Sequence, residues 1–351
     1  MQQITNYGSF LQAYGLKSII ESLGHDVEFV NIVIGEQLPQ YKISKLHKVR
    51  LMLKRLKVKH PFRQLQCTFR LHKRFDKEFK PELGVKPGNN DTHFDVVVIG
   101  SDEVFNVAQT TWFGFSTQLF GEGLDTDKVI SYAGCFGATT VAKLKELNID
   151  KRVGDLLSKM DAISVRDKNS VDVVTSLTNK KPNLNIDPVI AYEFEKEIVI
   201  PDIKEDFLFV YTYPGRMNDP KEVKAIKDYA RTNNLKVIAN ANYFDWVDEV
   251  VTPHPFEVLG YFKKAKCIVT DTFHGAVMSL KYNKPFAVIV RGMNSNKLTF
   301  LLEQFNLSSR TINNPVKLES IMDSEILYDP INDKIKEERK KTIEYLNKNL
   351  K

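Results

Sequence analysis

The sequence contains little cysteine and no long apolar run. Its three cysteines, Cys67, Cys135 and Cys267, are an odd number without a CxxC pair. This pattern argues against a disulfide framework and against a structural zinc site, so we expect buried or inactive thiols. No run approaches the roughly 18 apolar residues of a membrane span, and the N-terminus lacks the apolar core of a signal peptide. We therefore expect a cytoplasmic protein.

Metal-ligand spacings and cofactor fingerprints are also missing. No group of Asp and His residues has the spacing of a metal site, and no flavin or nicotinamide fingerprint occurs. We expect neither a metal nor an obligatory cofactor. The chain has 351 residues with 42% hydrophobic content, which is enough to bury two substantial cores.

Hydrophobic periodicity predicts alternating helices and strands in the first half. Residues 11–23 have helical spacing that ends at Gly24, and residues 27–34 follow as a strand. Continuous apolar runs predict further strands at 96–99, 129–132 and 162–165. Runs of this kind are buried on both faces, which is typical of a largely parallel sheet covered by helices.

A second α/β unit is predicted after the charged residues 193–205. Its expected strands are 207–213, 236–239, 267–269 and 285–290, and its helices are 220–232, 256–264 and one that begins at Gly275. We predict two doubly wound, Rossmann-like α/β domains. The N-terminal one covers 1–195 with a basic helical insertion at 42–80, and the C-terminal one covers 206–330. A helix at the C-terminus, within 331–351, crosses back to the first domain.

The segment VTDTFHGAVMSLKYNKPF, at 269–286, is the most informative stretch. It predicts a strand, a polar turn and a helix, with His274 at the helix N-terminus. Unpaired N–H groups and the positive dipole end attract an anion there, and a histidine can donate a proton to it. The alternative is a histidine that only caps the helix and packs on the sheet. Asp271 either orients the His274 ring or caps the helix.

Three further groups of polar residues could bind ligands. The turn of Asn6, Tyr7 and Gly8 offers N–H groups to a sugar or phosphate oxygen, or is an ordinary helix cap. Gly100, Ser101 and Asp102 follow a buried strand, where they form an acceptor-binding loop or an N-cap by Asp102. Arg166 ends another strand and suits a carboxylate or phosphate, unless it is a surface arginine paired with Asp167, which could also cap the next helix. Asp187 and Pro188 form a structural turn.

Four separated segments together resemble the polysaccharide pyruvyltransferase family. They are NYGSFLQAYGLKSIIESLGHDVEFV at 6–30, VVVIGSDEVFN at 96–106, AISVRDKNS at 162–170 with IDPVI at 186–190, and TDTFHG at 270–275. The resemblance implies transfer of pyruvate from phosphoenolpyruvate to a sugar as a ketal, in exopolysaccharide biosynthesis. It also implies a glycosyltransferase-B-like fold, with a cleft between the domains at the carboxyl ends of their strands.

The same resemblance implies roles for individual residues. His274 and Arg166 would be catalytic, with His274 as acid. Phosphoenolpyruvate would be bound by Arg166, Thr272, Phe273, His274, Gly275, Arg291 and Lys297. The glycan or lipid-linked acceptor would be bound by Asn6, Tyr7, Gly8, Gly100, Ser101 and Asp102.

The chain departs from the family pattern at several positions. Relatives usually have glutamine and tryptophan where this chain has Glu103 and Phe105, so these positions would change the acceptor if they touch the glycan. An arginine often stands where Lys297 is found, and lysine lacks its two-pronged geometry. The apolar strand before Asn6 is shortened or absent. Two alternatives therefore remain, namely a sugar-nucleotide-dependent glycosyltransferase and a non-catalytic glycan-binding relative.

The positive charge of the chain is local. Residues 42–80 contain fourteen Lys or Arg against two acidic residues, although the net charge of the whole chain is +6. Ile43, Leu46, Val49, Leu53 and Leu56 recur among these bases at helical spacing. We expect either a solvated helix packed on the first domain or peripheral contact with an anionic membrane, where lipid-linked precursors occur. No recognition motif for nucleic acid accompanies the bases.

Overall fold

In the computed structural model the chain divides into two units. The structure describes residues 2–36, 38, 60–86, 88, 92–108, 113–213, 215–240, 243–292 and 295–351. Unit 1 comprises Met1–Leu56, Lys80–Tyr192 and Ile335–Lys351, and unit 2 comprises Lys57–Phe79 and Glu193–Lys334. Part of the basic segment, which the sequence assigned to the first domain, thus belongs to unit 2. The stripe predicted over 43–56 lies outside the described residues.

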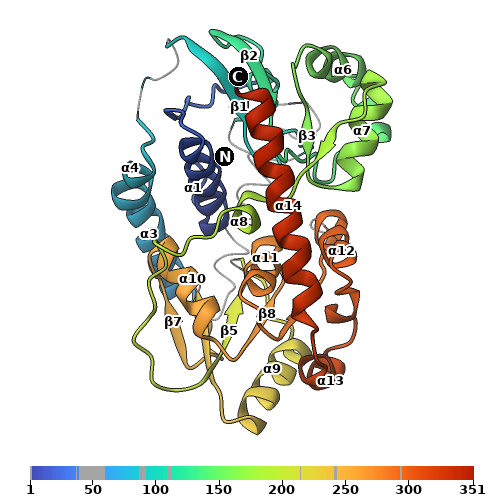
Figure 1. Ribbon diagram of the computed structural model, residues 1–351. Coiled ribbons are helices and arrows are strands. Elements are labelled where there is room, and N and C mark those ends of the chain that lie inside the picture. Colours follow the sequence, from blue (N-terminus) through green and yellow to red (C-terminus); the bar gives the residue numbers. More distant parts are fainter. Residues whose placement is uncertain are drawn as a thin grey trace. The chain divides into compact units, whose positions relative to one another are not determined.

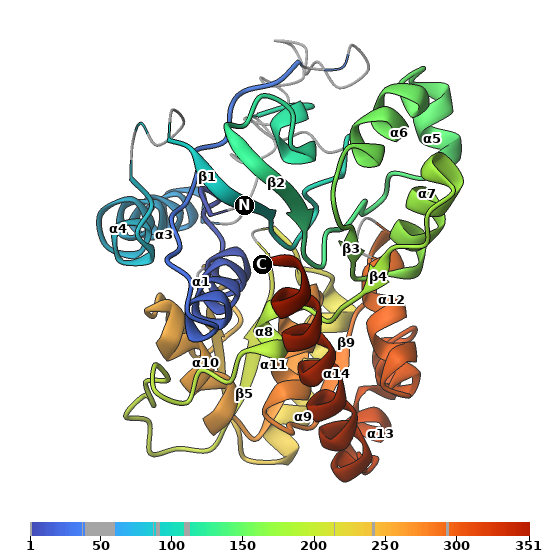
Figure 2. The ribbon, with the colours of Figure 1, turned by 45° about the horizontal axis from the view of Figure 1, so that its top comes forward.

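Unit 1 is built on short parallel strands. β1 (Phe94–Ile99) pairs in parallel with β2 (Thr126–Ser131), and β3 (Ser164–Val165) pairs with β4 (Asn183–Leu184). A bridge from Ile130 to Ala162 connects the two pairs. The helices are α1 (Tyr7–Ser22), α4 (Lys80–Leu83), α5 (Val141–Glu146), α6 (Asp150–Ser158), α7 (Lys168–Thr178), α8 (Pro188–Ala191) and the part of α14 (Tyr328–Asn349) from Ile335 onward. Figures 1 and 2 show α6 and α7 side by side beyond β3.

The strand predicted over residues 27–34 is wrong. These residues belong to no strand and form no ladder among the described residues. A strand needs a hydrogen-bonded partner, and Val27–Val30 do not pair with β1 but line a cavity of about 330 Å³ together with its residues. Residues 2–5 form turns, so no strand occupies the described residues ahead of α1.

Unit 2 contains a five-stranded parallel sheet in the order β7-β6-β5-β8-β9. The strands are β5 (Phe207–Tyr211), β6 (Lys236–Asn240), β7 (Glu249–Val251), β8 (Cys267–Thr270) and β9 (Phe286–Val288). Every residue of β5, β8 and β9 is buried, as predicted from their continuous apolar runs. The helices are α3 (Pro61–Arg74), α9 (Pro220–Thr232), α10 (Pro255–Lys264), α11 (Phe273–Lys281), α12 (Ser295–Gln304) and α13 (Leu318–Asp323). A five-residue π-helical segment, Phe75–Phe79, extends α3.

Parallel pairing places the carboxyl ends of the strands of unit 2 at one edge of the sheet. β5, β8 and β9 lie side by side, with Tyr211 opposite Thr270 and Thr270 opposite Val288. The polar residues that follow these strands are therefore neighbours. No helix of the described residues is long and apolar enough to cross a membrane.

Candidate functional site

The start of α11 is fixed by two threonines and a glycine. Thr272 is the N-cap, and its Oγ1 accepts a hydrogen bond from the Gly275 N–H at 2.9 Å. Thr270 Oγ1 donates to the carbonyl of Tyr211 at 2.7 Å. A Cβ at residue 275 would lie only 2.0 Å from Thr270 Oγ1, so only glycine fits where the helix passes the end of β8.

His274 is the second residue of α11, in the first turn as predicted. It is buried, with 3% of its surface exposed, and its ring lies 5.4 Å from that of Phe273 in an edge-to-face arrangement. The Lys297 ammonium lies 5.6 Å from the Phe273 ring centroid, which is within cation–π range. A helix N-terminus, an imidazole and an ammonium therefore share one region of unit 2. Of the predicted donor-binding residues, this brings Thr272, Phe273, His274, Gly275 and Lys297 together.

Asp271 has neither of its two predicted roles. It does not cap α11, and its hydrogen bonds do not go to His274. Its carboxylate accepts hydrogen bonds from Thr212 Oγ1 and from Arg291 Nε, both at 2.7 Å, and Arg216 lies 3.8 Å away. The capping role belongs to Thr272. Asp271 is fully buried, so these donors compensate for the lost hydration of its charge.

Arg291 is held between two carboxylates. Besides Asp271, it donates to Glu222 at 2.9 Å, and its side chain remains 30% exposed. Burial disfavours its charge, but the hydrogen bonds to Glu222 and Asp271 outweigh this and raise the pKa of Arg291 above its ordinary value. The charge predicted to bind a donor is thus already engaged within unit 2.

Sequence reasoning missed Thr212, Glu222 and Arg216. Thr212 directly follows β5, and the pairing of Tyr211 with Thr270 brings it next to Asp271. A polar residue after each of two adjacent parallel strands is a signal that could have found Thr212. Glu222 lies in the first turn of α9, and only the tertiary fold brings it to Arg291.

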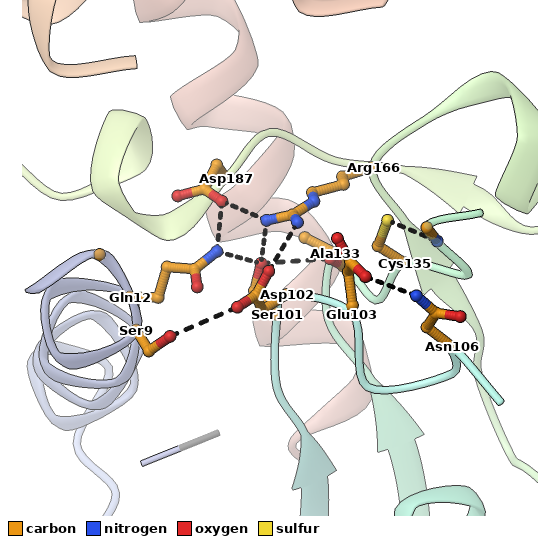
Figure 3. A network of polar contacts seen from close by, with 12 residues as sticks. Ser9, Gln12, Ser101, Asp102, Glu103, Asn106, Ala133, Cys135, Arg166 and Asp187 are labelled. Atoms are coloured by element: carbon orange, nitrogen blue, oxygen red, sulfur yellow. Dashed lines mark hydrogen bonds and ion pairs between the residues drawn. The ribbon is translucent and has the colours of Figure 1, made fainter. Parts of the chain in front are cut away.

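In unit 1, Arg166 is the centre of a buried polar network (Figure 3). Its guanidinium donates to Asp187 at 2.6 Å and to Asp102 at 3.0 Å, and it lies 3.4 Å from Ser101 Oγ. Gln12 of α1 donates to Asp187 and, at 3.0 Å, to Ser101. Burial alone would lower the pKa of Arg166, but Cys135, Asp102 and Asp187 raise it above its usual range.

The alternative of a surface arginine paired with Asp167 is wrong. The Arg166 side chain is 2% exposed. Asp167 caps α7 instead, accepting a hydrogen bond from the Ser170 N–H at 2.8 Å. Asp187 caps α8, as expected for a structural turn, and is also an ionic partner of Arg166.

The loop after β1 contributes two residues to this network. Ser101 is buried, and its hydroxyl donates to the carbonyl of Ala133 at 3.2 Å. Asp102 has a φ of 80°, a left-handed conformation that costs a non-glycine residue about 1–2 kcal/mol. Its carboxylate accepts from Arg166 and from Ser9 Oγ, at 3.3 Å, which holds it in that conformation. Gly100 approaches Leu16, whose Cδ2 would be 3.3 Å from an added Cβ.

Asn6, Tyr7 and Gly8 form a helix start. Asn6 is the N-cap of α1, and its Oδ1 accepts from the N–H groups of Gly8 at 2.7 Å and Ser9 at 3.4 Å. Tyr7 and Gly8 are buried. Of the two interpretations of this turn, the capping one is confirmed, and the N–H groups expected to be exposed are engaged.

Phe105 does not touch a glycan, because it is a core residue. It is fully buried, with its ring 5.0 Å from Phe120 and 5.2 Å from Phe136. A Cβ at Gly134 would lie 2.5 Å from the Phe105 ring, so the glycine makes room for it. Glu103 accepts a hydrogen bond from Asn106 three residues later.

One group of residues in the described part of the chain has metal-ligand geometry. His93, Asp95 and Asp127 offer ligand atoms within 4.8 Å of one another, where β1 and β2 begin. All three are exposed, and this end of the strands is opposite to the network of Arg166. The sequence did not reveal the group because Asp127 is remote from His93 along the chain.

Two solved structures of epimerases show a distant likeness to this chain. UDP-GlcNAc 2-epimerase from Neisseria meningitidis is 14% identical, with 98% of each chain covered and a TM-score of 0.46. A putative UDP-N-acetylglucosamine 2-epimerase from Listeria monocytogenes is 9% identical, with 92% of this chain and 90% of that chain covered and a TM-score of 0.44. No curated protein matches the chain.

A family model gives a much stronger match. The model for polysaccharide pyruvyl transferase matches residues 6–292. This range starts at the cap of α1 and includes the network around Arg166 and the α11 site with Asp271 and Arg291. The chain therefore belongs to the polysaccharide pyruvyl transferase family.

Proposed function

We propose that the protein transfers pyruvate from phosphoenolpyruvate to a glycan or lipid-linked sugar and forms a cyclic ketal. The supporting observation is that His274 lies in the first turn of α11 and within the range matched by the family, with its ring 5.4 Å and the Lys297 ammonium 5.6 Å from the ring of Phe273. The N-terminus of a helix and an ammonium group suit the carboxylate and phosphate of the donor.

The proposed reaction has two steps. The π electrons of the C2=C3 bond of phosphoenolpyruvate take up a proton at C3, which becomes a methyl group, and a sugar hydroxyl oxygen bonds to C2 and releases its own proton. A second hydroxyl of the same sugar then attacks C2 and displaces inorganic phosphate, which closes the ketal. His274 supplies the acid in this sequence, either to C3 or to the departing phosphate, and general acids of this kind contribute about 10²–10⁴-fold to the rate.

Arg291 has an indirect role in this proposal. Asp271 is a buried carboxylate that directly precedes the N-cap of α11, where it would repel an anionic donor. The hydrogen bond from Arg291 Nε to Asp271 compensates this charge. The 30% exposure of Arg291 leaves part of its guanidinium available to the donor.

Arg166 takes a positioning role. Its guanidinium is engaged by Asp102 and Asp187, so a donor anion would have to compete with two carboxylates. We assign to it the placement of Ser101 and Asp102, the proposed acceptor-binding residues of unit 1. Asp102 is the member of this ionic group that keeps some exposure, 17% of its side chain.

Donor identity tests the proposal. Phosphoenolpyruvate should raise the melting temperature of the protein, whereas UDP- and ADP-sugars should not, and turnover should release inorganic phosphate detectable by ³¹P NMR. Lys297→Met should abolish the shift with phosphoenolpyruvate. Lys221→Met, an exposed lysine on α9, is the matched control and should retain it. Stabilisation by a sugar nucleotide alone would instead support a glycosyltransferase, and no stabilisation or turnover with any donor would support a non-catalytic relative.

A further inference from the structure

Helix α3 (Pro61–Arg74) exposes large apolar side chains along one face. Phe62 is 82% exposed, Leu65 67% and Phe69 69%, and none of the helix residues is buried. Phe62 and Phe69 are the two exposed phenylalanines among the described residues. At about 100° per residue, positions 62, 65 and 69 fall on a single stripe. Contiguous exposed apolar surface of this kind usually marks an interaction site.

The opposite face attaches α3 to unit 2. Arg63 donates to the Tyr243 hydroxyl at 3.0 Å, and the ring of His60, just before the helix, lies 5.4 Å from that of Tyr243. At the other end, Arg74 donates to the carbonyl of Thr252. The following Phe79 is fully buried, with its ring 4.8 Å from that of His254. The helix is therefore held at both ends, and the exposed positions 62, 65 and 69 lie on the side of the helix away from Arg63 and Arg74.

Basic residues adjoin the apolar stripe. Arg70 and Lys73 are both exposed. Lys73 follows Phe69 by four positions and therefore lies beside it on the helix surface, whereas Arg70, one position after Phe69, lies about 100° further round the helix, on the flank of the stripe. Two acidic residues, Asp76 and Glu78, lie in the π-helical segment that continues α3, and Glu78 is paired with Arg74, on the attached face of the helix. The surface thus combines aromatic and aliphatic side chains with positive charge over a helix of roughly 20 Å, at 1.5 Å per residue.

We propose that the exposed face of α3 docks on an anionic lipid surface. Phe62, Leu65 and Phe69 enter the boundary between headgroups and acyl chains, and Arg70 and Lys73 contact the anionic headgroups. This combination of a narrow apolar face with flanking bases is the pattern of interfacial amphipathic helices. A surface that binds another protein would not need positive charges next to the apolar stripe. A surface that binds nucleic acid would not need three aliphatic or aromatic side chains on one stripe. The inference stands apart from the proposed reaction, because it concerns binding and not turnover.

Co-sedimentation of the full chain with vesicles tests the proposal. The wild type should pellet with vesicles of equal parts phosphatidylglycerol and phosphatidylcholine at low salt, and much less with phosphatidylcholine alone. The triple variant Phe62→Ser, Leu65→Ser, Phe69→Ser should lose on the order of a hundredfold in vesicle affinity, because its apolar burial is removed. Arg70→Gln with Lys73→Gln should lose about tenfold at low salt, and the loss should shrink at about 0.5 M salt, where charges are screened.

Matched controls lie on other surfaces of unit 2. Val316 and Leu327 are 85% and 71% exposed, and their change to serine should leave vesicle binding intact. Lys221→Gln with Lys227→Gln removes two exposed charges from α9 and should also leave it intact.

Three results would overturn the proposal. The wild type could fail to bind anionic vesicles, or the control variants could lose as much vesicle affinity as the α3 variants. The third is a concentration-dependent dimer that the triple serine variant abolishes, because the exposed face of α3 would then bind a second copy of the chain. Tight binding to an RNA of mixed sequence without vesicle binding would assign the bases to nucleic acid. In every variant, phosphoenolpyruvate should still raise the melting temperature. This measurement distinguishes a failure of the membrane-binding proposal from a failure of the proposed function.

Discussion

The two units each place an arginine among carboxylates after parallel strands, but the two groups differ in exposure. Arg166 and Asp187 of unit 1 have side chains only 2% and 1% exposed, whereas Arg291 of unit 2 is 30% exposed against a fully buried Asp271. The unit 1 network is closed upon itself and ties α1, the β1 loop, β3 and α8 together. The unit 2 group remains half open beside a helix N-terminus. The same residue types therefore position the loop of Ser101 and Asp102 in unit 1, whereas in unit 2, as we propose, they lie open to the donor.

The largest effect expected from this comparison is on stability. Arg166→Met would leave the buried charge of Asp187 and the partly buried charge of Asp102 without their cation, so the free energy of unfolding should fall by about 3–5 kcal/mol. Urea denaturation followed by circular dichroism measures the loss. Arg152→Met is the matched control in unit 1, since Arg152 forms an ion pair with Glu122 but is 50% exposed. It should lose less than about 1 kcal/mol. Similar losses in both variants would show that burial does not determine how much the Arg166 network contributes to the free energy of unfolding.

The next effect is on catalysis and separates two histidines of unit 2. His274→Ala should reduce pyruvate transfer more than about a hundredfold, the lower range for a general acid, while the protein stays folded. His254, the N-cap of α10, accepts a hydrogen bond from the Phe256 N–H at 3.3 Å. His254→Ala should lose about 1 kcal/mol of stability, as for a lost cap, with turnover retained. Steady-state assays combined with melting curves distinguish these outcomes. Full turnover in folded His274→Ala would remove His274 from the mechanism.

A smaller effect concerns the glycine behind the α11 site. Gly275→Ala would place its Cβ 2.0 Å from Thr270 Oγ1, so the helix start must shift, and overpacking of this kind costs typically 1–3 kcal/mol. Gly292→Ala meets nothing within 4 Å and should change stability by less than about 0.5 kcal/mol. Thermal unfolding of both variants checks this. Equal melting temperatures would mean that the start of α11 is not tightly packed on β8.

Local patterns predicted much of the fold, because their causes are local. Helix α9 has the predicted bounds 220–232, since Asp219 caps it and Pro220 suits its first turn. The strand, turn and helix around His274 follow from one continuous segment. In contrast, the strand predicted over 27–34 failed because a strand needs a partner, which periodicity does not reveal.

The site depended more on contacts between remote residues. Arg166 meets Asp102 and Asp187, and Arg291 meets Glu222, across 64, 21 and 69 positions of the chain. Phe105 looked like a candidate glycan contact from its motif, although its apolar ring belongs to the core with Phe120 and Phe136. The sequence could therefore indicate which residue types end the strands, but not which of their charges remain open to a ligand. The roles of His274 and Lys297 stay predictions.

The smallest expected effect lies at the start of β1 and β2, where carboxylates are exposed instead of buried. His93 Nδ1 is 2.9 Å from Asp125 Oδ1, and Nε2 is 3.6 Å from Asp127 Oδ2. The hydrogen bond to Asp125, together with the charges of Asp125 and Asp127, outweighs desolvation and raises the pKa of His93 above 6.5.

A raised histidine pKa fixes the direction of the pH dependence. The stability that His93 contributes is fully present below its unfolded pKa of about 6.5 and is lost as the pH rises through the folded pKa. An NMR titration of the His93 ring in the presence of a chelator should give a midpoint above 6.5 in the wild type and a lower one in Asp125→Asn. Asp172→Asn, whose carboxylate pairs with Lys168 on α7, should leave the midpoint unchanged. A wild-type midpoint at or below 6.5 would mean that solvent screens these exposed carboxylates, unlike those around Arg166.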